Sequence, residues 1–181
     1  MVVRVPRGAD RRCRLKRASL PIAVTLVTLA ATTGLSASVA QAATLTGRLE
    51  SWSPAGWCLD SDFGGNVYIK PCQAGNLHQK WEISVVGQED GSDIVQVKNA
   101  ATDGYLTVAS NAVRAQDDRK APQTRLIAVG TGWRGARLCR PQSGSHVCVQ
   151  TVQSADPGFR KVFVHEYEPS WWSMTWKRIA P

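Results

Sequence analysis

Residues that could do acid–base, nucleophilic or metal chemistry are present in the chain, but no spacing gathers them into a site. The three histidines are His78, His146 and His165, and none belongs to the H-E-x-x-H pattern of zinc hydrolases. No G-x-S-x-G sequence is present to expose a serine nucleophile. The carboxylates include no pair that the sequence singles out for glycoside hydrolysis. We therefore expect no enzyme, no metal and no cofactor, and a small secreted hydrolase is the function we rank last.

The remaining chemistry is recognition through aromatic rings. His165, Trp171 and Trp172 surround a proline in a segment that the sequence predicts to be a loop. Tryptophans in a solvated loop call for an explanation, and a flat ring can stack on the apolar face of a sugar or fill a pocket of a protein partner. The alternative is that Trp171 or Trp172 covers the open end of a barrel. The sequence leaves both roles open.

Cysteine usage indicates an oxidising compartment. Of five cysteines, Cys13 lies near the N-terminus, and the other four are Cys58, Cys72, Cys139 and Cys148. An even number in a small exported domain predicts two disulfides, with three possible pairings. We favour Cys58–Cys72 and Cys139–Cys148, because each pair flanks a predicted hairpin. A zinc site of four thiolates is the alternative, which the absence of C-x-x-C spacing disfavours.

Residues 1–42 have the organisation of a cleaved signal peptide. A basic segment precedes the apolar run 20–31, and small residues then end in Ala40-Gln41-Ala42, after which we predict cleavage. The apolar run is about twelve residues long, whereas a membrane span needs about twenty. We therefore expect a secreted, extracellular protein, exported in the bacterial manner, with no membrane span after cleavage. Arg11-Arg12 resembles a twin-arginine signal, so general secretion and twin-arginine export both remain open.

The positive charge of the chain belongs mostly to this leader. The whole chain has a net charge of +8, from 22 Lys and Arg against 14 Asp and Glu. Residues 1–42 hold seven of the bases and one of the acids, which leaves 15 bases against 13 acids in the rest. A surplus this small gives no reason to expect a nucleic-acid partner.

After residue 43 the sequence predicts only β-structure. Short runs of alternating apolar and polar residues, about twelve in all, are separated by turn residues such as Gly64-Gly65 and Asp90-Gly91. This pattern predicts a β-sandwich or a small barrel. Similar stretches recur at Gln79-x-Trp81, at Gln123 and at Trp176, which divides the chain into units of approximately 43–87, 88–131 and 132–181.

The recurring tryptophans and glutamines have a structural interpretation. Alternation along a strand puts Gln79 and Trp81 on the same side. We expect Trp81 and Trp176 to form part of a shared core, with their N–H groups bonded inside it. We expect the amide of Gln79 to satisfy backbone groups near a turn, and Gln123 to be its counterpart in the second unit.

The stretch Gly56-Trp-Cys-Leu-Asp60, followed by Val67-Tyr-Ile-Lys-Pro-Cys72 and His78-Gln-Lys-Trp81, resembles one repeat of the ricin B-type lectin family. The resemblance weakens along the chain, because Arg125 stands where the second Q-x-W tryptophan is expected and Met174 where the third glutamine is expected. It implies an all-β fold, a β-trefoil of three four-strand repeats, for a domain of residues 43–181.

The family resemblance also implies where a sugar would bind. In the first repeat it points to Asp60 as hydrogen-bond acceptor, with Lys70, His78 and Gln79 beside it and Tyr68 nearby; Lys70 stands where the family has a stacking aromatic. In the third repeat it points to His165, and Trp171 and Trp172 lie close to His165 in the sequence. The expected function is a secreted carbohydrate-binding protein with one or two partly degraded sugar sites. The alternative is a protein-binding trefoil, such as a toxin cell-binding subunit or a protease inhibitor.

Overall fold

The computed structural model describes residues 44–109, 111–130, 132–142, 144–152, 158 and 160–180. The chain divides into two units, Met1–Val39 and Ala40–Pro181, and all the described residues belong to the second. The predicted signal peptide, residues 1–42 with Cys13, lies outside the described residues, so its cleavage stays a prediction. In the part of the chain that the structure describes, no helix is long and apolar enough to cross a membrane.

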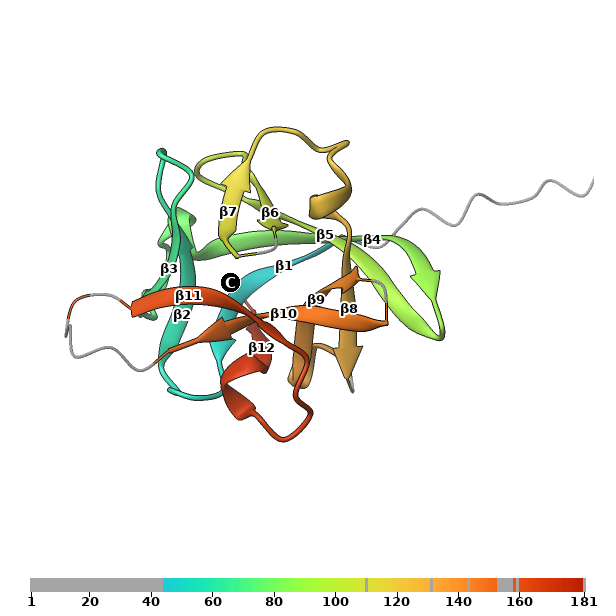
Figure 1. The fold of residues 1–181 in the computed structure, drawn as a ribbon. Coiled ribbons are helices and arrows are strands. Elements are labelled where there is room, and N and C mark those ends of the chain that lie inside the picture. The colour runs from blue at the N-terminus through green and yellow to red at the C-terminus, as the bar shows by residue number, and fades with distance from the viewer. Residues whose placement is uncertain are drawn as a thin grey trace, which may run out of the picture. The chain divides into compact units, whose positions relative to one another are not determined.

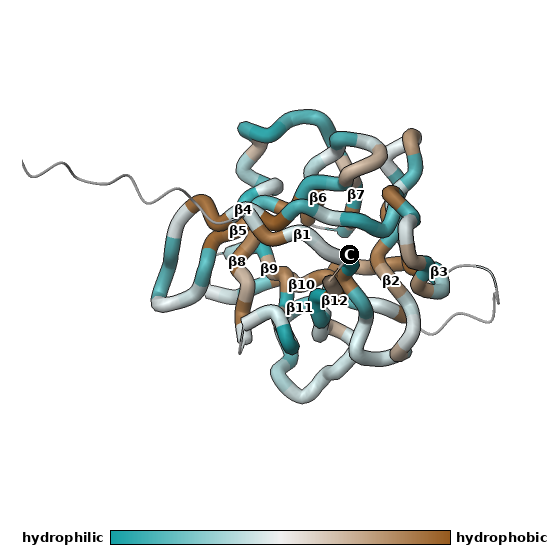
Figure 2. Tube along the Cα trace, turned by 180° about the vertical axis from the view of Figure 1, so that it is seen from behind, coloured by the Kyte–Doolittle hydropathy of each residue, from teal (hydrophilic) through white to brown (hydrophobic). Residues whose placement is uncertain are grey.

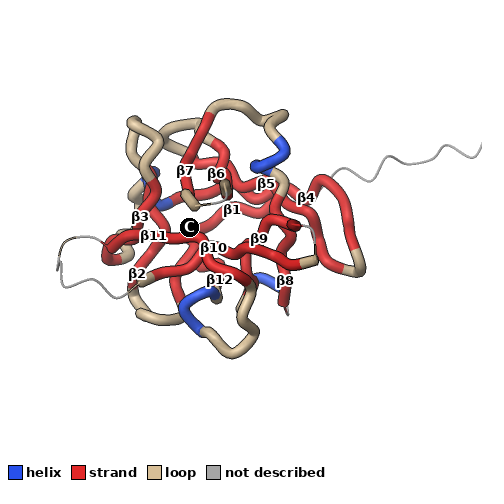
Figure 3. The backbone as a smooth tube through the Cα atoms, in the orientation of Figure 1, coloured by secondary structure: helices blue, strands red, loops and turns tan. Residues whose placement is uncertain are grey.

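The described residues form strands joined by turns and short 3-10 helices (Figure 1; Figure 3, strands red and helical turns blue). The strands are β1 (Thr44–Ser51), β2 (Trp57–Ser61), β3 (Val67–Pro71), β4 (Lys80–Glu89), β5 (Ser92–Asn99), β6 (Tyr105–Val108), β7 (Val113–Gln116), β8 (Leu126–Gly130), β9 (Ala136–Gln142), β10 (Ser145–Thr151), β11 (Arg160–Glu166) and β12 (Trp176–Ile179). The 3-10 helices are η1 (Leu77–Gln79), η2 (Pro122–Thr124), η3 (Gly132–Arg134) and η4 (Trp172–Met174). The expectation of an all-β domain is confirmed.

The strands pair into one antiparallel sheet that closes on itself. Its order is β10-β11-β3-β2-β1-β12-β9-β8-β5-β6-β7, with β4 paired to β1 and β5, and with β10 paired back to β9. The prediction of a β-trefoil of three four-strand repeats is therefore corrected to one twelve-stranded antiparallel sheet that closes into a barrel. The physical reason is that the backbone N–H and C=O groups at a strand edge form hydrogen bonds with a neighbouring strand, whether or not that strand belongs to the same repeat. Ladders accordingly run across the expected repeat boundaries, from β1 to β12 and from β3 to β11.

The units also differ from one another in their pairing. The ladder between β1 and β4 contains five residue pairs, whereas β12 meets β9 only at Trp176 and Ala136. Short similar sequences thus predicted local hairpins correctly but not how the hairpins join.

Hydrophobic residues concentrate along the strands and hydrophilic ones in the connecting loops (Figure 2).

Two buried tryptophans anchor the core as expected. Trp81 and Trp176 are both fully buried, and each indole N–H donates to a backbone carbonyl, Trp81 to Leu59 at 2.9 Å and Trp176 to Val149 at 3.2 Å. Each of them follows a 3-10 helix by two residues. The same position after η2 is occupied by Leu126, which is also fully buried.

This position corrects the predicted role of Gln123. Since Leu126 rather than Arg125 matches Trp81, the counterpart of Gln79 is Thr124, one residue after Gln123. Thr124 is fully buried, and its hydroxyl lies 2.8 Å from the carbonyl of Ala121. Gln123 itself is only half-buried. The prediction was off by one residue because it aligned Gln123 with Gln79 by residue type, whereas the buried position is that of Thr124.

Both favoured disulfides are present. Cys58 in β2 is bonded to Cys72, just after β3, and Cys139 in β9 is bonded to Cys148, its direct ladder partner in β10. Each bond therefore closes a hairpin. In the described residues no group of three or more His, Cys, Asp or Glu side chains is arranged to hold a metal ion.

Candidate functional site

In the first predicted sugar site, the acidic residue is not accessible to a ligand. Asp60 is only 2% exposed and lies directly opposite Tyr68 in the β2–β3 ladder. Burial raises the pKa of Tyr68 to about 12, and the nearby charge of Asp60 and its hydrogen bond with the tyrosine hydroxyl add to this effect. The carboxylate of Asp60 is thus engaged within the hairpin rather than presented to a ligand.

Gln79 is likewise a structural residue. Its side chain is fully buried, its Oε1 accepts from the backbone N–H of Gln73 at 2.8 Å, and its Nε2 donates to the carbonyl of Pro71 at 3.1 Å. Both ends of the amide are therefore used, as the sequence predicts for a buried glutamine near a turn. They are not available to a sugar hydroxyl.

The other first-site residues point to separate places. The ring Nδ1 of His78 lies 2.6 Å from the carbonyl of Ser61, and its ring packs edge-on against Phe63 at 5.1 Å. The Lys70 ammonium lies 5.0 Å from the centre of the Tyr68 ring. Lys70 and Tyr68 line a pocket with neither His78 nor Gln79 among its lining residues. Of the five predicted residues, Lys70 and Tyr68 thus line this pocket, Asp60 is hydrogen-bonded to Tyr68 but is not part of the lining, and His78 and Gln79 lie elsewhere.

The aromatic residues of the C-terminal segment are exposed, but they form two contacts rather than one cluster. Trp171 is 40% exposed and lies with its ring centre 4.7 Å from that of His165. Trp172 is 59% exposed and stacks on Trp52, with ring centres 5.6 Å apart and planes 25° apart. Neither Trp171 nor Trp172 is buried in the barrel core.

Trp52 is a residue that the sequence analysis missed. It lies in the turn between β1 and β2, is 45% exposed, and is followed by Ser53 and Pro54. The signal was the same as for Trp171 and Trp172, a tryptophan beside a proline in a predicted turn. We refer to the stacked pair Trp52 and Trp172 as the tryptophan platform.

Buried hydrogen bonds fix the backbone under the tryptophan platform. The N–H of Trp52 donates to the carbonyl of Thr175 at 2.8 Å, which joins the β1–β2 turn to the end of η4. The hydroxyl of Thr151, itself 2% exposed, lies 2.7 Å from the carbonyl of Ser53 and 3.2 Å from that of Ser173. Both tryptophans therefore extend from segments held by the same buried contacts.

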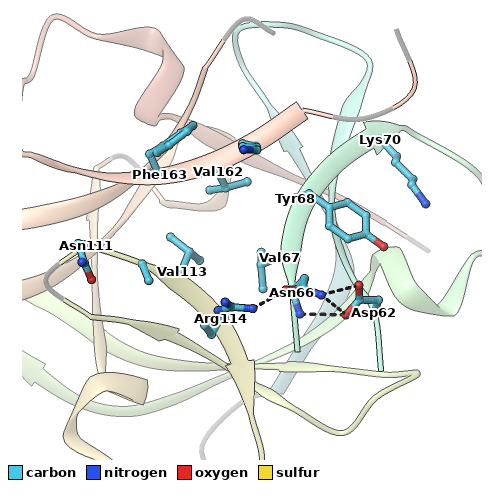
Figure 4. Close-up of a pocket in the computed structure, with 12 residues that line it drawn as sticks. Asp62, Asn66, Val67, Tyr68, Lys70, Asn111, Val113, Arg114, Val162 and Phe163 are labelled. Carbon is cyan, nitrogen blue, oxygen red and sulfur yellow. Dashed lines mark hydrogen bonds between the residues drawn. The ribbon is translucent and has the colours of Figure 1, made fainter. Parts of the chain in front are cut away.

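A pocket of 640 Å³ lies elsewhere, where the hairpins β2–β3, β6–β7 and β10–β11 meet (Figure 4). Three valines, Val67, Val113 and Val162, belong to its lining, one from each hairpin. Around them lie the further lining residues Asp62, Asn66, Tyr68, Lys70, Asn111, Ala112, Arg114, Lys161 and Phe163. This pocket was not expected from the sequence.

Comparison with known proteins gives structural likeness only. No family model matches the chain, and no curated protein matches its sequence. A chain of the cytolethal distending toxin of Actinobacillus actinomycetemcomitans superposes with a TM-score of 0.60 at 12% identity, over 75% of this chain and 91% of that one. The Haemophilus ducreyi toxin gives 0.59 at 12% identity, over 75% and 83%.

A lectin is also among the similar structures. The Polyporus squamosus lectin, solved with a human-type influenza-binding epitope, superposes with a TM-score of 0.55 at 14% identity, over 73% of this chain and 47% of that one. At such low identities these likenesses establish a shared fold and nothing about the ligand.

Proposed function

We propose that the protein is a secreted carbohydrate-binding protein that holds glycans on the tryptophan platform. The observation that carries this proposal is the stacked pair Trp52 and Trp172, 45% and 59% exposed, on segments tied down by buried hydrogen bonds. The similar lectin and toxin structures support a fold that serves recognition. The proposal includes cleavage of the leader after Ala42.

The platform fits the chemistry of a sugar ring. A pyranose has an apolar face of C–H groups that stacks on an aromatic ring, and its hydroxyls can stay in water. Large exposed aromatic surface is otherwise unfavourable, so a stacked exposed pair is a candidate binding surface. Because the backbone beneath the two rings is already held, little ordering is needed when a ligand arrives.

A flat surface of this kind gives weak binding at a single site. Asp60, the acid of the other expected sugar site, is buried against Tyr68 and adds no hydrogen bonds to a ligand. We therefore expect useful affinity only when several copies engage a clustered glycan.

The second candidate function is protein binding, as in a toxin subunit that attaches to cells. The likeness to two cytolethal distending toxin chains favours it. The tryptophan platform would then be the anchor of a protein interface, since tryptophan is enriched among residues that dominate such interfaces.

A glycan array, probed with the exported, oxidised protein in multivalent form, tests the proposal. Binding that is lost in Trp172→Ala and in Trp52→Ala, but kept in Phe63→Ala, supports the platform. Phe63 is a matched control because it is 80% exposed and packs instead on His78. Binding that survives both tryptophan changes moves the sugar site elsewhere, and no binding to any glycan favours a protein partner.

A further inference from the structure

The pocket between the three hairpins has an apolar floor built in the same way from each hairpin. In the ladders, Val67 faces Ser61, Val113 faces Val108, and Val162 faces Thr151. Each valine is thus held by the partner strand of its own hairpin. All three are buried, with 8%, 6% and 8% exposure. The floor is therefore rigid and carries no hydrogen-bonding side chain.

The three hairpins are joined around this floor. Strand β11 pairs with β3 where Lys161 meets Tyr68, and Asn66 forms a bridge with Arg114 at the start of β7. Figure 4 shows the valines between these strands, with Phe163 above them and Tyr68 to one side. The pocket thus exists in the folded protein without any rearrangement.

The rim of the pocket carries a surplus of positive charge. Lys70, Arg114 and Lys161 line it, and Asp62 is the one carboxylate among the described lining residues. Asp62 is already engaged, because its oxygens accept from the backbone N–H of Asn66 at 2.9 Å and from its side-chain amide at 2.9 and 3.2 Å. Its charge is therefore partly satisfied before any ligand enters.

Lys70 and Lys161 form no described salt bridge, and Arg114 is attracted by Asp62, whose oxygens are already bonded to Asn66. Arg114 donates to the side-chain oxygen of Asn66, a neutral acceptor. Lys70 lies over the ring of Tyr68. The described salt bridges join Lys98 to Asp103 and Lys177 to Glu50, and none of these four residues lines the pocket.

We infer that this pocket binds a small organic anion with an apolar body, such as an aromatic or aliphatic carboxylate, sulfonate or phosphate ester. The apolar body contacts the three valines and Phe163, and the anionic group is held by Arg114 and Lys161 at the rim. A volume of 640 Å³ lies within the usual range for small-molecule sites. A sugar acid fits less well, because its hydroxyls would meet valine side chains without hydrogen-bond partners.

This inference does not depend on the proposed function. Trp52 and Trp172 are not among the residues that line the pocket. Loss of glycan binding and loss of anion binding can therefore be produced by separate variants.

The test uses a charged dye and a neutral one of similar shape. We expect 8-anilinonaphthalene-1-sulfonate to bind the full oxidised protein with one-to-one stoichiometry and enhanced fluorescence, and the binding to weaken as salt is added. Arg114→Gln and Lys161→Gln should each weaken it by about fivefold, as loss of one exposed charge contact does. The neutral N-phenyl-1-naphthylamine should bind all these proteins alike.

Two further variants complete the experiment. Lys120→Gln removes an exposed cation outside the pocket and should leave the sulfonate affinity unchanged. Ala112→Trp fills the pocket and should abolish binding of both dyes. Near-UV circular dichroism must match the unsubstituted protein, because the sulfonate dye also binds loosened states.

Competition with the dye shows which class of anion the pocket prefers. Decanoate should displace the sulfonate dye at lower concentration than glucuronate. Equal affinity in Arg114→Gln, in Lys161→Gln and in the unsubstituted protein would overturn the inference, as would displacement by glucuronate but not by decanoate.

Discussion

Asp60 and Tyr68 lie directly opposite each other in the β2–β3 ladder, and the tyrosine hydroxyl is hydrogen-bonded to the buried carboxylate. A buried carboxylate needs donors, and the cross-strand tyrosine supplies one. The pair therefore strengthens the hairpin that Cys58 and Cys72 also close. It explains why an acid in the expected sugar-binding position does not reach the surface.

The first prediction concerns the alkaline titration of Tyr68. Its pKa is raised from 10.0 to about 12, so the folded protein holds this proton more tightly than the unfolded chain. The resulting stabilisation is complete below pH 10 and is lost as the pH rises toward 12. Urea unfolding at pH 9, 10 and 11 should show a steeper loss of stability in the unsubstituted protein than in Tyr68→Phe. Parallel pH profiles would contradict the raised pKa.

The second prediction compares two glutamines. Gln79→Ala removes a fully buried side chain and leaves the N–H of Gln73 and the carbonyl of Pro71 without their partners, and should lower the free energy of unfolding by about 1–3 kcal/mol. Gln123→Ala, at a half-buried position, should change it by less than about 0.5 kcal/mol. Denaturant unfolding measures both. Similar losses for the two variants would mean that the structural equivalence with Thr124 is wrong.

Local spacing in the sequence was enough to predict part of this architecture. Cys58 and Cys72, like Cys139 and Cys148, are close in sequence and flank a single hairpin, so their pairing follows from short-range geometry. Gln79 and Trp81, two residues apart, are both fully buried, as their predicted position on the same side requires. These features depend on residues only a few positions apart.

Features that depend on distant segments could not be predicted in this way. Trp52 and Trp172 come together from opposite ends of the barrel sequence, and the β1–β12 pairing and the hydrogen bond from Trp52 to Thr175 bring their segments side by side. The pocket needs three hairpins to converge on Val67, Val113 and Val162. The expected three-repeat trefoil was wrong for the same reason, since repeated short motifs do not specify how strands pair across unit boundaries.

The third prediction separates core tryptophan from surface tryptophan. Trp176→Ala removes a fully buried side chain and its hydrogen bond to Val149, and should cost about 3–5 kcal/mol of folding stability. Trp172→Ala, at a 59% exposed position, should cost less than about 1 kcal/mol while abolishing glycan binding. Thermal or urea unfolding together with the glycan array gives both readouts. A large stability loss in Trp172→Ala would assign the platform a structural role instead.

The last prediction concerns the two disulfides. Cys58 and Cys72 are separated by 14 residues, and the paired change of both to Ala should lower the free energy of unfolding by about 3 kcal/mol through the greater entropy of the unfolded chain. Cys139 and Cys148 are separated by 9 residues, so their paired change should cost slightly less by the same argument. Urea unfolding of the two double variants, with the oxidised protein as reference, measures the difference.

Because the first bond closes the hairpin that contributes Val67 and Tyr68 to the pocket, its loss should also weaken binding of the sulfonate dye. Loss of the second bond should affect the dye equally only if β10, which pairs with β11, transmits the change to Val162. Unchanged dye affinity in both double variants would show that the strand ladders alone maintain the pocket.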